Sequence, residues 1–198
     1  MSKHTEKQAP DLQHLTFHPL TPERWSDLEQ LFGPRGACAG CWDMYWRIKR
    51  SEYEAHKGEG NRESFQALVQ GGTVPGILAY DGDKPVGWCA VEPREAYPAL
   101  ERSRILKPVD EQPVWSITCF FIARGYRRSG LSRHLIEASV EWAKKQGATI
   151  VEGYPKEKQK EGEAAAFAWT GYAEAYRKAG FKEVARRSET RPIMRKNL

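Results

Sequence analysis

The pattern of apolar and polar residues is clearest between residues 114 and 146. From 114 to 122 nearly every residue is apolar, β-branched or aromatic, which is the composition of a strand buried on both faces. After Gly130 the apolar residues recur with helical spacing, at Leu131, Leu135, Ala138 and Trp142. Gly147 is expected to end this helix. The stretch therefore predicts a strand, a tight turn and an amphipathic helix.

The same reasoning predicts the other elements of the chain. Strands are expected at residues 12–20, 76–80, 85–91, 149–154, 181–186 and 191–196. Helices are expected after the N-cap Thr21, near Glu52, after the cap Asn61, from Ala164, and at residues 172–179. A right-handed crossover would make the strand at 149–154 parallel to the strand at 114–122. This order of elements indicates an α/β fold.

Long polar segments separate some of these elements. Residues 93–113 and 155–163 read as connections on the surface, the first with one helical turn. Residues 1–11 are polar and are expected to form a flexible tail, which leaves residues 12–198 as a single domain.

Composition narrows the class of protein. The chain has 198 residues and a formal net charge of +5, with its basic residues interspersed among Asp and Glu. This distribution argues against a dedicated nucleic-acid binder. No apolar run is long enough for a membrane span, and the first residues lack the apolar region of a secretory signal. With four cysteines and no secretory signal, we expect a cytoplasmic protein that does not enter a membrane.

The junction between the central strand and its helix carries candidate chemistry. Residues 127–132 read Arg-Arg-Ser-Gly-Leu-Ser and place small residues where backbone N–H groups open a helix. Unpaired amides at a helix N-terminus can bind a phosphate group, and the neighbouring arginines add positive charge. An ordinary turn with a solvated basic rim explains the same residues equally well.

This segment resembles motif A of the GNAT superfamily of N-acetyltransferases. The motif has Arg or Gln, two residues, Gly, one residue, then Gly or Ala. Arg127 and Gly130 match it, whereas Ser132 replaces the final small residue. A second resemblance lies near the C-terminus, where Tyr176 stands four positions before Gly180 in the sequence AEAYRKAGF. The resemblance extends over about residues 75–181 and adds the structural context that a short motif requires.

The resemblance implies a fold, a cosubstrate and a set of site residues. The implied fold is a mixed, mostly antiparallel sheet with helices on both faces, whose parallel central strands open into a V that binds acetyl-CoA. The cofactor-binding residues implied are Phe120, Phe121, Ile122, Arg127, Arg128, Ser129, Gly130, Leu131 and Ser132. The first three would pair with the pantetheine arm through their backbone, and the others would surround the pyrophosphate.

The resemblance also implies catalytic roles. Tyr176 would protonate the departing thiolate, because a phenol keeps its proton at neutral pH. Tyr172, one turn earlier, is the alternative acid or a residue of the acceptor pocket. The attacking amine also needs a base, and the central strand has no carboxylate. Glu152 and Glu92 are the candidates, alongside a water relay; a carboxylate paired with a nearby arginine is the structural alternative for either.

Cys38 and Cys41 form a CxxC pair that resembles half of a zinc or redox site. No second Cys or His pair lies nearby, so we expect no metal and assign the thiols a structural role. The aromatic residues that follow, Trp42, Tyr45 and Trp46, would either stack against a flat or cationic acceptor or belong to the core.

These patterns together predict an acetyl-CoA-dependent N-acetyltransferase that acts on a small-molecule or peptide amine. The alternative is an acyl-CoA-binding or regulatory module with the same fold and without significant turnover. The sequence leaves the acceptor and the oligomeric state open, a homodimer included.

Overall fold

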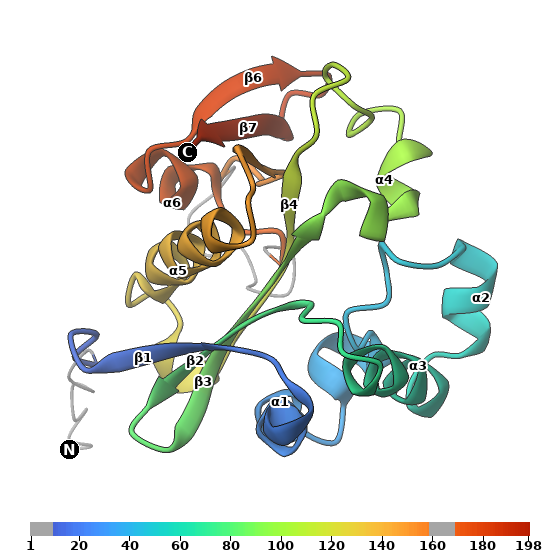
Figure 1. The fold of residues 1–198 in the computed structure, drawn as a ribbon, viewed down its shortest axis with the longest axis vertical. Helices are drawn as coiled ribbons and strands as arrows, with labels where there is room; N and C mark the ends of the chain where they lie inside the picture. The colour runs from blue at the N-terminus through green and yellow to red at the C-terminus, as the bar shows by residue number, and fades with distance from the viewer. Residues whose placement is uncertain (1–9, 159–168) are drawn as a thin grey trace, which may run out of the picture.

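The protein folds around one seven-stranded sheet with helices on both of its faces (Figure 1). The computed structural model describes residues 10–158 and 169–198. Most of the predicted tail, part of the predicted loop at 155–163 and the predicted start of a helix at Ala164 therefore lie outside the described residues. No helix in the described ranges is long and apolar enough to cross a membrane.

The elements follow the predicted order. The strands are β1 (Leu15–Pro19), β2 (Gly76–Asp81), β3 (Lys84–Pro93), β4 (Trp115–Ile122), β5 (Ile150–Gly153), β6 (Lys182–Arg186) and β7 (Pro192–Asn197). The helices are α1 (Trp25–Phe32), α2 (Arg50–Ala55), α3 (Glu59–Gln70), α4 (Pro98–Glu101), α5 (Leu131–Lys145) and α6 (Ala173–Lys178). Shorter helical turns are η1 (Pro22–Arg24), η2 (Gly36–Gly40), η3 (Arg94–Ala96) and η4 (Arg124–Tyr126).

The sheet has the order β1-β2-β3-β4-β5-β7-β6 and is antiparallel except between β4 and β5. The β4–β5 pairing runs only from Trp115↔Val151 to Ile117↔Gly153. β4 then continues to Ile122, while β5 has already ended. The two strands thus part in the middle of the sheet, which confirms the predicted fold class.

Alternate residues of the central strands pack into two separate cores. Ile77 and Cys89 face the core that contains α5 and α6, whereas Leu78 and Trp88 face the core that contains α1 and α3. This period of two is the pleat of a strand buried on both faces. The same two helix pairs lie on opposite sides of the sheet in Figure 1.

One predicted helix cap is wrong. Asn61 lies inside α3 and is fully buried, and Gly58 occupies the cap position instead. The Asn61 amide nitrogen Nδ2 donates to the carbonyl oxygens of Gly40, at 3.2 Å, and of Tyr53, at 3.4 Å. In the sequence Asn61 resembles a cap because it is a polar residue next to helix-forming residues. In the structure its side chain instead bonds the backbone of segments that precede α3.

Gly153, the last residue of β5, makes room for Tyr176 of α6. A Cβ atom at this position would lie 2.1 Å from Cε1 of Tyr176. The close approach of this ring to the backbone therefore depends on glycine, and it fixes α6 against the end of β5.

We therefore expect Gly153→Ala to lower the free energy of unfolding by about 1–3 kcal/mol through overpacking. Gly125→Ala is the matched control, because a Cβ there meets no heavy atom within 4 Å. Urea denaturation of both variants tests this. Equal stability of the two variants would contradict the packing argument.

Candidate active site

The turn between β4 and α5 has the conformation needed to present backbone amides. Gly130 has a φ of 98° and is the N-cap of α5, and Arg128 adopts a positive φ of 64°. Only glycine takes such a φ without strain, which explains why the turn places it at this position. The Arg133 N–H donates to the Gly130 carbonyl oxygen at 3.0 Å, which leaves the Leu131 and Ser132 N–H groups to open the helix, and the first turn has no acidic residue. This helix end can bind an anion.

Two side chains of the turn hold its shape. The Arg127 Nε donates to the Ile122 carbonyl oxygen at 2.9 Å, and the Ser129 hydroxyl donates to the Tyr126 carbonyl oxygen at 2.7 Å. The turn is thereby fixed to the end of β4. The predicted cofactor-binding residues 127–132 thus run continuously from this turn into the start of α5.

The edge of β4 that faces the gap is already partnered. The Phe120 N–H donates to the Trp169 carbonyl oxygen at 2.6 Å, and the Ile122 carbonyl accepts from Arg127. Since an amide has one hydrogen to donate, a ligand that pairs with Phe120 must replace the Trp169 carbonyl. The predicted backbone sites lie at the gap, but the chain satisfies two of them itself.

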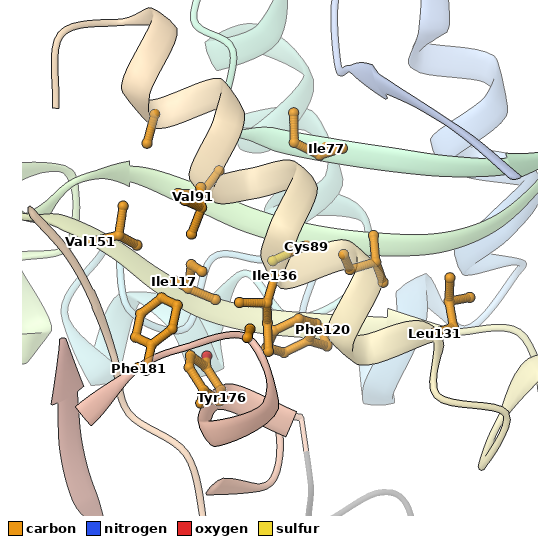
Figure 2. Close-up of a cluster of buried hydrophobic side chains, with 14 of the residues drawn as sticks. Ile77, Cys89, Val91, Ile117, Phe120, Leu131, Ile136, Val151, Tyr176 and Phe181 are labelled. Atoms are coloured by element: carbon orange, nitrogen blue, oxygen red, sulfur yellow. The ribbon is translucent and has the colours of Figure 1, made fainter. Parts of the chain in front are cut away.

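Tyr176 lies at the same gap, beside the ring of Phe120 (Figure 2). The two ring centroids are 6.2 Å apart and nearly perpendicular, and Phe181 packs against the other edge at 5.1 Å. The hydroxyl is fully buried and donates to the Thr170 carbonyl oxygen across 3.4 Å, a long hydrogen bond. Burial raises the pKa of Tyr176 well above its ordinary value, so the phenol stays protonated.

Tyr172 is placed differently from Tyr176. It precedes α6 as the N-cap residue and forms a parallel bridge pair with Lys156. Its backbone therefore helps to attach α6 to the chain that follows β5.

Glu152 of β5 is buried in an ion-pair network. Its carboxylate accepts from Arg195 Nε at 2.6 Å, from Arg94 at 3.1 Å and from the Tyr154 hydroxyl at 2.7 Å. Arg195 also reaches Asp110, at 2.7 Å. The side chain predicted as a base thus lies between two guanidinium groups, and the network joins β5 to β7 and to η3.

A cavity of ≈280 Å³ opens beside the free part of β4. Its β4 wall consists of Cys119, Phe120 and Phe121. The remaining lining residues are Phe32, Ala37, Cys38, Ala39, Cys41, Asp43, Tyr45, Trp46, Tyr53 and Trp169. Both predicted CxxC thiols and two of the three predicted aromatic residues therefore face one space, together with a carboxylate that the sequence analysis did not single out.

That carboxylate, Asp43, is part of a buried cluster of charges. Arg47 bonds Asp43 at 3.1 Å through one terminal nitrogen and approaches Glu92 of β3 to 2.5 Å through the other. Burial raises the pKa of both carboxyls, although Arg47 opposes the shift. The only sequence signal for the cluster was the i, i+4 spacing of Asp43 and Arg47 among aromatic residues.

The loop that carries Asp43 has an unusual backbone. Ala37, Ala39, Trp42 and Asp43 all have positive φ, between 42° and 64°. Each such residue costs of order 1–3 kcal/mol and persists only where its surroundings hold it. Gly40 supplies that support, because it packs on the Gly58 backbone, where a Cβ would approach to 2.6 Å, and accepts the Asn61 hydrogen bond.

The cysteines of this loop are free thiols. The Cys41 N–H donates to the Cys38 carbonyl oxygen at 3.2 Å, so the pair spans a turn. Burial raises the pKa of Cys41, which keeps it a neutral part of the cavity wall. Among residues 10–158 and 169–198, no group of three or more His, Cys, Asp or Glu side chains is arranged to bind a metal ion.

A mixed sheet that splays beside a glycine-capped helix N-terminus and a cavity is compatible with a coenzyme A-dependent acyltransferase. Comparison with known proteins specifies the family. Residues 41–181 match the model of the acetyltransferase (GNAT) family, and the chain belongs to this family. Its members take an acetyl group from acetyl-CoA. No curated protein sequence is significantly similar to the chain.

Solved structures share the fold at low sequence identity. A GNAT-family acetyltransferase from Listeria monocytogenes 4b F2365 is 9% identical over 93% of this chain and 95% of that chain, with a TM-score of 0.57. The ribosomal-protein-S5-alanine acetyltransferase of Vibrio fischeri is 13% identical over 96% and 97%, with a TM-score of 0.53. The NatC complex bound to Gag peptide and CoA matches at 10% identity over 94% and 99%, with a TM-score of 0.51.

The charge cluster predicts a pH dependence of stability. Asp43 and Glu92 bind protons more tightly in the folded chain than in the unfolded chain, so their contribution to stability falls as the pH rises above about 4. Glu92→Gln removes one of these charges. We expect the stability of this variant, relative to the natural protein, to increase between about pH 4 and pH 8.

Glu183→Gln is the control with the opposite sign. Arg186 lowers the pKa of this exposed glutamate, so the substitution should cost stability as the pH rises. Urea denaturation of each variant across the pH range measures both slopes. A difference between Glu92→Gln and the natural protein that does not change with pH would show that the cluster holds no excess negative charge.

Proposed function

We propose that the protein is an N-acetyltransferase that moves the acetyl group of acetyl-CoA directly to an amine. The observation that carries this proposal is the convergence of three features on the end of β4. The anion-binding turn follows this strand, Tyr176 packs against Phe120 from one side, and the cavity is lined by Cys119, Phe120 and Phe121. A thioester held along β4 would then lie between an acid and an acceptor site.

The donor side is supported by the turn at the N-terminus of α5. The pyrophosphate would accept hydrogen bonds from the amides of Leu131 and Ser132, with Arg128 adding charge. One fold neighbour, the NatC complex, contains CoA in its crystal structure. Direct pairing of the pantetheine arm with Phe120 would require Trp169 to release the Phe120 amide.

The chemistry needs one proton removed and one supplied. The amine nitrogen forms a bond to the thioester carbonyl carbon, the carbon–sulfur bond breaks, and the sulfur takes a proton from Tyr176. Two properties support this role for Tyr176: the buried phenol is protonated, and its hydrogen bond to the Thr170 carbonyl is long enough for another acceptor to replace it. The attacking nitrogen loses its own proton to a base or a water.

The base is proposed among the carboxylates near the gap. Glu152 was predicted from the sequence, but its arginine partners favour a role in holding the end of β5. Asp43 is the carboxylate that lines the cavity, and its raised pKa brings it closer to the working pH of a base. Glu92 would influence the Asp43 carboxyl because both are paired with Arg47.

A charge introduced at the turn tests the donor site. Ser132→Glu places a carboxylate in the first turn of α5, where it stabilises the helix but repels a pyrophosphate. We expect the Kd for acetyl-CoA to rise about tenfold or more while the melting temperature is kept. Ser132→Ala, which restores the family pattern, should bind within about twofold of the natural protein. Isothermal titration calorimetry measures both, and unchanged affinity of Ser132→Glu would exclude this helix end as the phosphate site.

Removal of one hydroxyl tests the acid. Tyr176→Phe should lower turnover by about 10²–10⁴-fold and leave the affinity for acetyl-CoA nearly unchanged. The matched control is Tyr80→Phe, which removes a different tyrosine hydroxyl. That hydroxyl donates to the Asp27 carboxylate at 2.7 Å. Release of free thiol is followed with dithiobisnitrobenzoate. Full activity of Tyr176→Phe would assign the residue to packing alone.

A further inference from the structure

The cavity beside β4 has a wall of aromatic rings. The Tyr45 centroid lies 4.9 Å from that of Trp46 and 5.2 Å from that of Trp169, and both contacts are edge-on. Trp46 and Trp169 are 5.6 Å apart and tilted by 32°. Phe32 and Phe121, at 5.4 Å from each other, also line the cavity. Such a wall binds flat apolar groups and also attracts cations to its ring faces.

The charges behind this wall do not balance. Asp43 and Glu92 share a single guanidinium, that of Arg47, so the ionised cluster has one negative charge in excess. Asp43 is 6% exposed and lines the cavity, whereas Arg47 and Glu92 lie behind it. A buried, incompletely paired carboxylate favours a bound cation.

Other charged and titratable groups near the cluster do not supply that cation. The remaining groups coupled to Asp43 or Glu92 carry no positive charge, namely Cys41, Trp88, Cys89, Tyr97 and Cys119. Arg50 lies over the Tyr45 ring but is paired with Glu54.

Arg191 is the other partly buried arginine in this part of the protein. It donates to the Thr170 hydroxyl at 2.9 Å, and burial lowers its pKa, an effect that Tyr45 opposes. It is not among the residues that line the cavity. The excess negative charge therefore remains on the Asp43–Glu92 pair, of which Asp43 is the member that lines the cavity.

We propose that this cavity binds the acceptor, and that the acceptor is a small monoamine with an aromatic or apolar body whose ammonium group pairs with Asp43. The inference rests on the proposed acetyltransferase function. A volume of ≈280 Å³ lies near the lower limit of about 300–1,000 Å³ for ligand pockets, which suits a small molecule. The aromatic wall holds the body, Asp43 fixes the nitrogen, and the neighbouring β4 edge brings the nitrogen to the thioester.

Two other classes of amine fit these features less well. A polyamine has several charges, and the described lining offers one carboxylate among apolar rings. A peptide N-terminus has backbone amides and carbonyls that lose their water on entry and need several polar partners, whereas the aromatic wall offers mainly ring surface, with the Trp46 indole N–H as a buried donor that has no partner.

The test uses a matched pair of probes, 2-phenylethylamine and 2-phenylethanol, which differ in the charged group alone. Quenching of tryptophan fluorescence reports entry, because Trp46 and Trp169 line the cavity. We expect the natural protein at neutral pH to bind the amine about tenfold more tightly than the alcohol. In Asp43→Asn this preference should fall to about threefold or less, with the affinity for the alcohol unchanged. Asp27→Asn, which alters a carboxylate outside the cavity, should keep the preference.

A second variant covers the case in which Asp43→Asn does not fold. Glu92→Gln leaves Asp43 in place and brings the cluster to zero net charge, so it should also reduce the preference for the amine. An amine preference that survives both substitutions, or that is lacking in the natural protein, would overturn the proposal.

Turnover separates this inference from the proposed function. Thiol release from acetyl-CoA is compared with 2-phenylethylamine, spermidine and a short peptide with a free N-terminus. The highest kcat/KM with 2-phenylethylamine supports the proposal. If spermidine or the peptide is acetylated and 2-phenylethylamine is not, the acceptor assignment is refuted, but the proposed acetyltransferase function stands. If acetyl-CoA binds but none of the three amines is acetylated, the proposed function is refuted.

Discussion

β4 and β5 pair as far as Ile117↔Gly153 and then part, and the site depends on this interruption of the sheet. A strand that loses its neighbour leaves backbone groups to be satisfied in another way. Here the Phe120 N–H bonds the Trp169 carbonyl, and the Tyr176 ring fills the space beside Gly153. The chain thus satisfies the backbone at the gap itself and fills the space beside Gly153, and the thioester site that we propose lies at this gap.

Two buried acids near the gap show how local partners decide a role. Glu152 has two arginines and a tyrosine hydroxyl, so its charge is compensated and it joins β5 to its neighbours. Asp43 shares one arginine with Glu92, which leaves the charge at the cavity incompletely balanced. The first arrangement contributes to structure, whereas the second costs stability that a cationic ligand can return.

The cavity and the loop beside it are linked by strain. Four non-glycine residues from Ala37 to Asp43 have positive φ, and contacts from α3, through Asn61, hold them there. Strain of this kind is maintained only where the surrounding packing imposes it, and it gathers at binding sites. In this protein it accompanies a loop whose Asp43 and cysteines face one cavity, which is also lined by residues of α1, α2 and β4.

The sequence by itself determined the elements whose signals are local. The apolar run of β4, the glycine that opens α5 and the stripe of α5 are separated by few residues, so periodicity and turn chemistry predict them directly. The position of Tyr176 before Gly180 was likewise read from a short pattern.

Only the tertiary structure decided the rest. Asn61 proved to be a buried tie to Gly40, and Asp43 gained its meaning from Glu92 on another strand. Hydrogen bonds and charge balances between distant segments leave no periodic trace in a sequence, because they depend on which surfaces the fold brings together.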